Sequence, residues 1–211
     1  MIVPNPARGL FIAFDGPGGA GKSTSLAAVQ AHLESDRGVQ VHATAEPTDT
    51  ELGRLIRTGT DCYRGPALAH LVLADRHQHL DNEILPALAA GKIVLCDRWI
   101  ASTLVLQALD GVEPGTLWKL NRHFPHPDLT VMVTARQAVR AKRLAERGTH
   151  SRFERDAELA VQEADLFAHT ATFLRARRFN LYEVDTTDAA AEQVAAEVAT
   201  CIKTLRKRQD P

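Results

Sequence analysis

The stretch Leu10-Phe-Ile-Ala-Phe-Asp-Gly-Pro-Gly-Gly-Ala-Gly-Lys-Ser-Thr24 decides the fold. Its apolar beginning, residues 10–14, predicts a strand that is buried on both faces. Residues 16–23 then match the Walker A pattern G-x-x-x-x-G-K-[ST], in which backbone amides surround phosphate oxygens. Glycines suit this turn because a Cβ would obstruct the approach of the phosphate to the backbone. The stretch therefore predicts a strand, a phosphate-binding loop and a helix, in that order.

The end of the loop supplies the charge and the hydroxyl that a triphosphate with Mg²⁺ requires. Lys22 would place its ammonium beside phosphate oxygens, and the Ser23 hydroxyl would hold Mg²⁺. The helix predicted from residue 23 to about residue 34 would point the positive end of its dipole at the same phosphates. These features indicate a nucleoside triphosphate site.

A rival pattern overlaps the loop. Gly16, Gly18 and Gly21 also spell G-x-G-x-x-G, the dinucleotide-binding fingerprint, and Glu46 could serve as its ribose-binding acid. A dinucleotide site gains nothing from a lysine and a hydroxyl directly after the third glycine, whereas a triphosphate with Mg²⁺ uses both. The sequence therefore favours a triphosphate.

Composition and charge limit the classes of protein to which this sequence can belong. The 211 residues are 45% hydrophobic, which is enough for a substantial core, and we expect one domain over residues 1–211. A formal net charge of −1 provides no basic field to recruit nucleic acid. The three cysteines are widely spaced and fit neither a disulfide framework nor a zinc site. With no signal peptide in residues 1–9 and no membrane-spanning stretch, we expect a cytoplasmic protein.

Hydrophobic spacing predicts five strands that alternate with helices. Such alternation requires a three-layer α/β fold, with a parallel sheet covered by helices on both faces. The alternating pattern of residues 39–44 predicts an edge strand, and Pro86 is expected to kink the end of a long helix that begins at residue 65. The other predicted strands are residues 10–14, 92–97, 129–133 and 181–185, and the other predicted helices are residues 23–34, 51–57, 102–109, 116–123, 138–146, 156–177 and 189–205.

Charged residues end two of the apolar runs. Asp97 and Arg98 follow a buried strand, and ligands bind at the carboxyl ends of strands in open α/β sheets. We expect Asp97 to organise Mg²⁺ with Ser23, rather than only to cap the next helix, and Arg98 to face an anionic substrate. Arg76 ends the other run, where an unpaired cation is costly. Either an ion pair with Asp75 or a substrate-facing role would explain it.

Residues 147–155 form a long polar insertion with a glycine and three arginines, Arg147, Arg152 and Arg155. One interpretation is a solvated face. Because a phosphate loop is present, we instead predict a short lid whose arginines close over the triphosphate and neutralise the transferring group.

The chain resembles the thymidylate kinase family through nearly all of its length. The order and spacing of the matching pieces are more specific than any one of them. These pieces are residues 11–16 with the loop, Glu46-Pro47, residues 74–79, Asp97-Arg98, Ser102-Thr103 with Gln107, residues 127–129 and residues 152–154.

The resemblance implies a five-stranded P-loop kinase that transfers the ATP γ-phosphoryl group, with Mg²⁺, to dTMP or a related nucleoside monophosphate, usually as a homodimer. It implies the catalytic residues Lys22, Asp97, Arg98, Arg147 and Arg152, with Ser23 and Asp97 serving the metal. Implied ATP-binding residues are Gly16, Gly18, Gly19, Ala20, Gly21, Lys22, Ser23 and Thr24. Implied acceptor-binding residues are Asp15, Glu46, Val72, Arg76, Arg98, Thr103 and Gln107.

Four positions depart from the family pattern. The family usually has an acid at Gly18, a stacking aromatic at Val72, a tyrosine at Leu106 and an acid at Ser151. Since the departures concern the acceptor side, a kinase for another phosphorylated acceptor is one alternative. A nucleotide-binding module without catalysis is a second, which the complete loop and the lid arginines disfavour. No Asn-Lys-x-Asp motif supports a regulatory GTPase.

Overall fold

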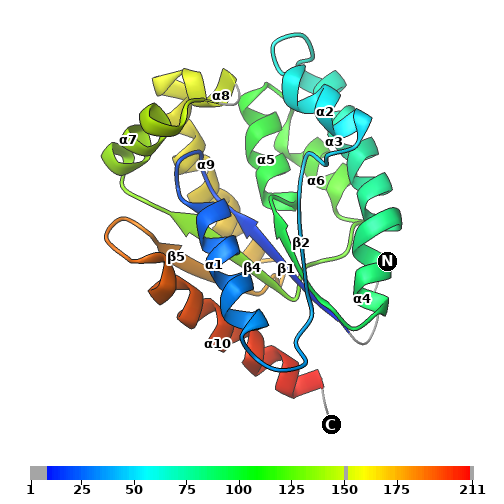
Figure 1. Cartoon of the computed structure of the whole chain (residues 1–211). Coiled ribbons are helices and arrows are strands. Elements are labelled where there is room, and N and C mark those ends of the chain that lie inside the picture. Colours follow the sequence, from blue (N-terminus) through cyan, green and yellow to red (C-terminus); the bar gives the residue numbers. More distant parts are fainter. Residues whose placement is uncertain (1–8, 150–151, 210–211) are drawn as a thin grey trace.

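The computed structural model describes residues 9–149 and 152–209, and its centre is a parallel sheet of five strands in the order β2-β3-β1-β4-β5 (Figure 1). This confirms the predicted sheet. In the register, Phe14 of β1 lies opposite Asp97 of β3, so the phosphate loop and Asp97 emerge side by side. The strands are β1 (Leu10–Asp15), β2 (Val41–Ala45), β3 (Ile93–Asp97), β4 (Leu129–Thr134) and β5 (Leu181–Asp185).

Helices cover both faces of the sheet. One face carries α1 (Lys22–Glu34) and α10 (Ala191–Gln209), which pack against each other (Figure 1). The other face carries a larger group, in which α5 (Ile100–Leu109) packs against α9 (Ala157–Arg175). The remaining helices are α2 (Glu51–Thr58), α3 (Gly65–His79), the π-helical turn η1 (Leu80–Ile84), α4 (Leu85–Ala89), α6 (Pro114–Asn121), α7 (Gln137–Arg147) and α8 (Arg152–Arg155).

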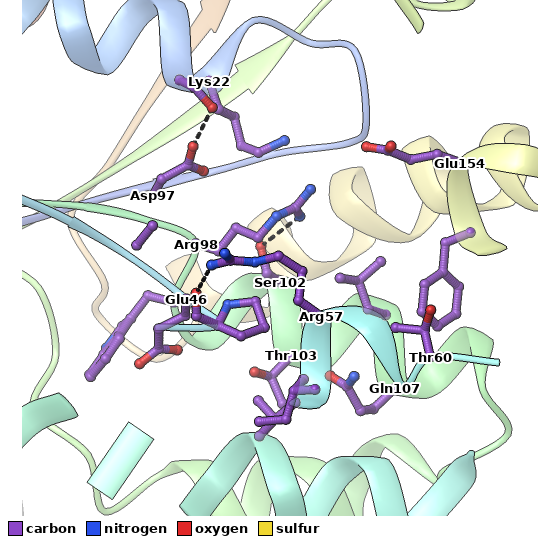
Figure 2. Close-up of a pocket in the computed structure, with 18 of the residues that line it drawn as sticks. Lys22, Glu46, Arg57, Thr60, Asp97, Arg98, Ser102, Thr103, Gln107 and Glu154 are labelled. Carbon is purple, nitrogen blue, oxygen red and sulfur yellow. Dashed lines mark hydrogen bonds between the residues drawn. The ribbon is translucent and has the colours of Figure 1, made fainter. Parts of the chain in front are cut away.

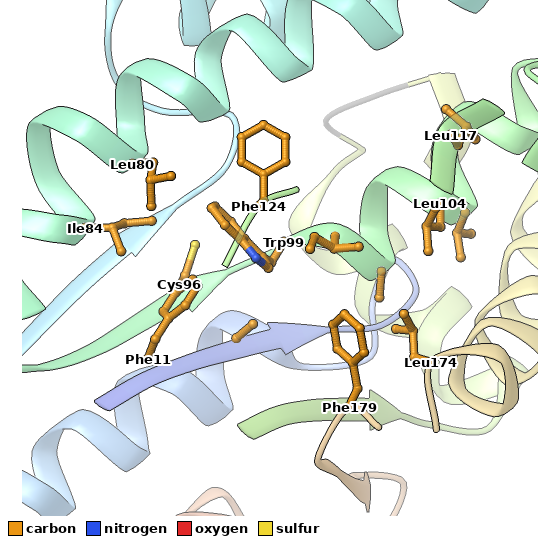
Figure 3. Close-up of a cluster of buried hydrophobic side chains, with 14 of the residues drawn as sticks. Phe11, Leu80, Ile84, Cys96, Trp99, Leu104, Leu117, Phe124, Leu174 and Phe179 are labelled. Carbon is orange, nitrogen blue, oxygen red and sulfur yellow. The ribbon is translucent and has the colours of Figure 1, made fainter. Parts of the chain in front are cut away.

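Alternation along β1 divides the core into two layers. Leu10, Ile12 and Phe14 point toward α1 and α10, whereas Phe11 and Ala13 point toward the opposite layer. That layer holds the larger aromatic side chains (Figure 3), and its labelled members are Phe11, Leu80, Ile84, Cys96, Trp99, Leu104, Leu117, Phe124, Leu174 and Phe179. Because β1 is packed on both faces, the position at which the phosphate loop leaves the sheet is fixed.

Two local predictions change. The end of the long helix contains the π-helical turn η1, and Pro86 follows it in the first turn of α4, where a missing N–H is tolerated. The insertion at 147–155 is partly helical: Arg147 ends α7, and α8 buries Phe153. Ser151 and residues 1–8 lie outside the described residues. Within residues 9–149 and 152–209, no helix is long and apolar enough to cross a membrane.

Candidate active site

The phosphate loop connects β1 to α1 and keeps its lysine buried. Lys22 is 6% exposed, and its Nζ donates to the carbonyl oxygen of Pro17 at 2.9 Å. Burial, helped by the nearby Arg98 charge, lowers the pKa of Lys22 to about 8. At Gly16, a Cβ would lie 2.1 Å from the carbonyl oxygen of Val133, which accounts for the glycine there. The hydrogen-bond acceptor of the buried ammonium is a neutral carbonyl, so an anion in the loop would offer it a charged partner.

The loop hydroxyl and the acid at the end of β3 lie within hydrogen-bonding distance of each other. Ser23 Oγ donates to Asp97 Oδ2 at 2.5 Å. The other carboxylate oxygen, Asp97 Oδ1, is buried and has no hydrogen-bond partner among the described residues. Hydroxyl and carboxylate oxygens are ligands that suit Mg²⁺, which usually keeps several waters and binds few protein groups. The described residues contain no cluster of three His, Cys, Asp or Glu side chains that could hold a metal ion.

A cavity of about 530 Å³ joins the loop to helices α3 and α5 (Figure 2). This volume lies in the usual range of ligand sites, about 300–1,000 Å³. The predicted residues that line it are Gly19, Gly21, Lys22, Ser23, Thr24, Glu46, Val72, Arg76, Asp97, Arg98, Thr103, Gln107 and Arg147. The triphosphate side and the acceptor side predicted from the sequence therefore share one cavity.

Arg76 is held by a buried network beneath the acceptor side of the cavity. Its guanidinium donates to Glu46 Oε2 from Nε at 2.9 Å and from Nη2 at 2.6 Å. Nη2 also donates to Thr103 Oγ1 at 2.8 Å, and Nη1 donates to Asn121 Oδ1 at 2.5 Å. The proposed ion pair with Asp75 is wrong, because Asp75 accepts from Thr48 instead. Arg76 thus combines an internal ion pair with a position in the cavity wall.

Arg98 has an unusual backbone. Its φ of 75° lies in the left-handed region, while its N–H donates to the carbonyl oxygen of Phe14 at 2.8 Å. Non-glycine residues in this region are strained, and such strain clusters at functional sites. The side chain lies in the cavity near Ser102, with Nη1 donating to Ser102 Oγ at 3.4 Å (Figure 2). This guanidinium stands between the loop and the acceptor side.

Five of the predicted site residues do not line the cavity, namely Asp15, Gly16, Gly18, Ala20 and Arg152. The carboxylate of Asp15 accepts from the backbone N–H groups of Trp99 and Ser102 and from the Ser102 hydroxyl. It thereby supports the start of α5, and burial raises its pKa. Its assignment to the acceptor stays a prediction.

Each arginine of the predicted lid faces a carboxylate. Arg147, in the cavity wall, forms a two-bond ion pair with Glu154 at 2.9 Å. Arg152 pairs with Asp110 at 2.6 Å, and Arg155 pairs with Asp61 at 2.5 Å. In this arrangement Arg152 is turned toward Asp110 and away from the cavity wall.

Sequence reasoning missed several lining residues, of which Arg57 is the most polar. It lies on α2 and donates to the backbone carbonyl of Pro47 and to Asp49 Oδ1. Its signal was a basic residue on a short amphipathic helix, which solvent exposure also explains. Phe153 and Glu154 were quoted only as part of a motif, although both line the cavity. A Cβ at Gly18 would lie 3.0 Å from Glu154 Cγ, so the missing side chain at Gly18 leaves room for this glutamate.

A phosphate loop with a buried lysine, a Ser–Asp pair suited to Mg²⁺ and an arginine-lined acceptor side define a P-loop phosphotransferase. Comparison with known proteins agrees with this class. The family model "Thymidylate kinase" matches residues 14–198. The chain belongs to the thymidylate kinase family.

Individual relatives give the same result. A protein of Pyrococcus horikoshii named "Probable thymidylate kinase" is 38% identical over 162 residues, which are 72% of this chain and 78% of the relative. The thymidylate kinase of Pseudomonas syringae is 34% identical over 206 residues, covering 93% of this chain and 94% of the relative. The crystal structure of thymidylate kinase from Ehrlichia chaffeensis superposes with a TM-score of 0.69 at 24% identity, over 92% of this chain and 98% of that one. At this level of identity, the structural likeness supports the assignment of the fold.

Proposed function

We propose that the protein transfers the γ-phosphoryl group of ATP to dTMP or a related nucleoside monophosphate. The observation that carries this is one shared cavity, which is lined by Lys22, Ser23, Arg98 and Arg76. Phosphoryl transfer depends mainly on bringing donor and acceptor together and on neutralising negative charge. The relatives described above carry the names "Probable thymidylate kinase" and "Thymidylate kinase", which favours dTMP as the acceptor.

Ser23 and Asp97 would hold Mg²⁺, because the unpartnered Asp97 Oδ1 and the loop hydroxyl offer oxygen ligands on one side of the cavity. When bound, the ion would neutralise charge on the β- and γ-phosphates. Lys22 would leave the Pro17 carbonyl and bind phosphate oxygens. Arg98 would bind the acceptor phosphate and orient it toward the γ-phosphoryl group. Arg147 would break its ion pair with Glu154 and bind the transferring phosphoryl group instead.

The base of the acceptor would lie against Val72 and Leu106, with Arg76, Thr103 and Gln107 supplying polar contacts. Hydrogen-bond donors and acceptors beneath an apolar wall suit the edge and the face of a nucleobase. A second candidate is a kinase for another phosphorylated acceptor. It is favoured by the aliphatic side chains at Val72 and Leu106, which offer no ring for stacking.

The test is an acceptor screen. The protein is incubated with ATP, Mg²⁺ and one nucleoside monophosphate at a time, and ADP release is measured. The Lys22→Ala variant, prepared in parallel, gives the background from contaminating ATPases. We expect acceptor-dependent ADP release that is highest with dTMP or a close analogue. Release no higher than that of Lys22→Ala with every acceptor would refute the proposal.

We also propose that the protein acts as a homodimer, by analogy with its family. Light scattering coupled to gel filtration would measure the mass in solution. A monomer mass at micromolar concentration would contradict this.

A further inference from the structure

Two carbonyl groups of the phosphate loop accept hydrogen bonds from side chains that lie outside the cavity. Arg140 on α7 donates Nε–H to the Gly18 carbonyl at 3.0 Å, and the Thr186 hydroxyl donates to the Ala20 carbonyl at 2.7 Å. In a trans peptide group the C=O and the following N–H point in opposite directions. The N–H groups of Gly19 and Gly21 therefore point away from these donors. Both glycines line the cavity, so this orientation serves phosphate oxygens.

One buried ion pair forms hydrogen bonds with both the backbone N–H and the backbone carbonyl of Gly18. Its N–H donates to Glu163 Oε2 at 3.0 Å, while its carbonyl accepts from Arg140. The two charged groups lie 3.7 Å apart, and both residues are about as buried as the core, at 3% and 1% exposure. Arg140 Nη2 also donates to the carbonyl of Ala160 on α9 at 2.7 Å. Burying two charges is costly, and linking α7 to α9 does not require charged side chains. A role in holding the loop would account for the burial of this pair.

The peptide group between Pro17 and Gly18 connects Glu163 with the catalytic lysine, Lys22. The N–H of Gly18 and the C=O of Pro17 belong to the same planar unit and point in opposite directions. Glu163 binds the N–H end, and Lys22 Nζ donates to the C=O end. Glu163 thus fixes the carbonyl on which the lysine rests, and Arg140 fixes the next peptide group, which carries the N–H of Gly19.

We propose that Arg140 and Glu163 are positioning residues for phosphoryl transfer, which set the orientation of the two peptide groups around Gly18 before ATP binds. The proposal rests on the proposed function, because it concerns the donor side of that site. Neither residue lines the cavity, so they act through the loop and do not touch the substrate. Loss of the pair should raise the cost of organising the loop and should leave the acceptor side unchanged.

The main variant is Arg140→Met with Glu163→Met, which removes both charges at similar volume. Replacing a buried ion pair by apolar residues is often neutral for stability or favourable, whereas removing one partner leaves a buried charge. The matched control is Lys142→Met with Glu146→Met, an exposed pair on the same helix α7. Steady-state kinetics give kcat and KM for ATP and for the acceptor, calorimetry gives the Kd of ATP with Mg²⁺, and thermal melting gives the folded fraction.

We expect kcat/KM for ATP to fall about tenfold to a hundredfold per folded molecule, the loss that a small misplacement near the reacting groups causes. The acceptor KM should change by less than about threefold, and the control should match the wild type. A folded double variant with the kcat/KM for ATP of the control would overturn the proposal. So would a loss that merely follows the unfolded fraction.

Two further measurements keep the test decisive. If the double variant does not fold, Arg140→Lys keeps the charge opposite Glu163 but replaces the guanidinium fork, which reaches Gly18 from Nε and Ala160 from Nη2, by a single nitrogen atom. Unchanged ATP kinetics in that variant would overturn the proposal. If the wild type phosphorylates no acceptor, the proposed function fails. The Kd for ATP then decides the role of the pair, and equal values for the wild type and the double variant count against it.

Discussion

Substituting Glu46→Gln tests the buried network under the acceptor side of the cavity. Glu46 accepts two hydrogen bonds from Arg76 through Oε2, and its Oε1 lies 3.2 Å from His79 Nδ1. The Arg76 and Glu46 side chains are 1% and 5% exposed, so water cannot replace the lost carboxylate. The variant keeps the shape of the side chain and removes the charge that balances the guanidinium.

The expected cost follows from that burial. Removing one partner of a buried ion pair typically destabilises a protein by about 3–5 kcal/mol. Arg76 retains its bonds to Thr103 and Asn121 and lies 4.7 Å from the centre of the Trp99 ring, which favours the lower end of this range. For a chain of this size, about 3–5 kcal/mol corresponds to a fall in melting temperature of roughly 6–20 °C.

Thermal and urea unfolding of the variant and the wild type measure this cost. Asp188→Asn is the matched control, because it makes the same acid-to-amide change in the ion pair of Asp188 with Arg136, whose side chains are 82% and 66% exposed. Exposed pairs contribute only about 0–1 kcal/mol. A loss below about 1 kcal/mol for Glu46→Gln, or a loss equal to that of the control, would refute the reasoning. If the variant folds at low temperature, its acceptor KM should rise, since Arg76 loses its fixed position.

Three other predictions concern the cavity. Lys22→Ala should lower phosphoryl transfer about a hundredfold to a thousandfold while the protein stays folded, because loss of a preorganised charge contact costs about 3–4 kcal/mol of barrier; near-normal turnover would contradict the site. Val72→Phe should raise kcat/KM for dTMP, since stacking on a ring contributes about 1–3 kcal/mol, whereas a wild-type value already above about 10⁴ M⁻¹s⁻¹ that the variant does not improve would show that stacking is not limiting. Hydrogen exchange in α8 should slow when ATP analogue and acceptor bind, and equal protection with and without them would count against a lid; because Phe153 anchors this helix, we expect the change to be moderate.

The donor half of the site was predictable because its residues are close together in the sequence. A Walker A stretch specifies a strand, a loop and a helix within fifteen residues, from Leu10 to Thr24. Asp97 could be added because parallel strands end at the same edge of the sheet, and the register of β1 with β3 places it there. The local sequence pattern, together with the rule that parallel strands end at the same edge of a sheet, was sufficient to predict the donor half of the site.

The partners of buried charges could not be predicted in this way. Arg76 was recognised as costly, but its neighbour Asp75 points in a different direction around the helix. Its true partner, Glu46, lies thirty residues earlier in the sequence. The contact between Gly18 and Glu163 spans 145 residues. Such pairs depend on how α3, α7 and α9 pack against the sheet, which periodicity does not determine.

This difference bears on the departures from the family pattern at Val72 and Leu106, which lie outside the loop. The loop tolerates little change, because Gly16 meets the Val133 carbonyl and the loop carbonyls are held by Arg140 and Thr186. Val72 lines the cavity from helix α3, so an aliphatic residue in place of an aromatic one there changes the acceptor contacts and not the phosphate loop. A chain can therefore alter its acceptor contacts without losing ATP binding. The acceptor preference then depends on the side chains at Val72 on α3 and Leu106 on α5, together with the absent side chain at Gly18.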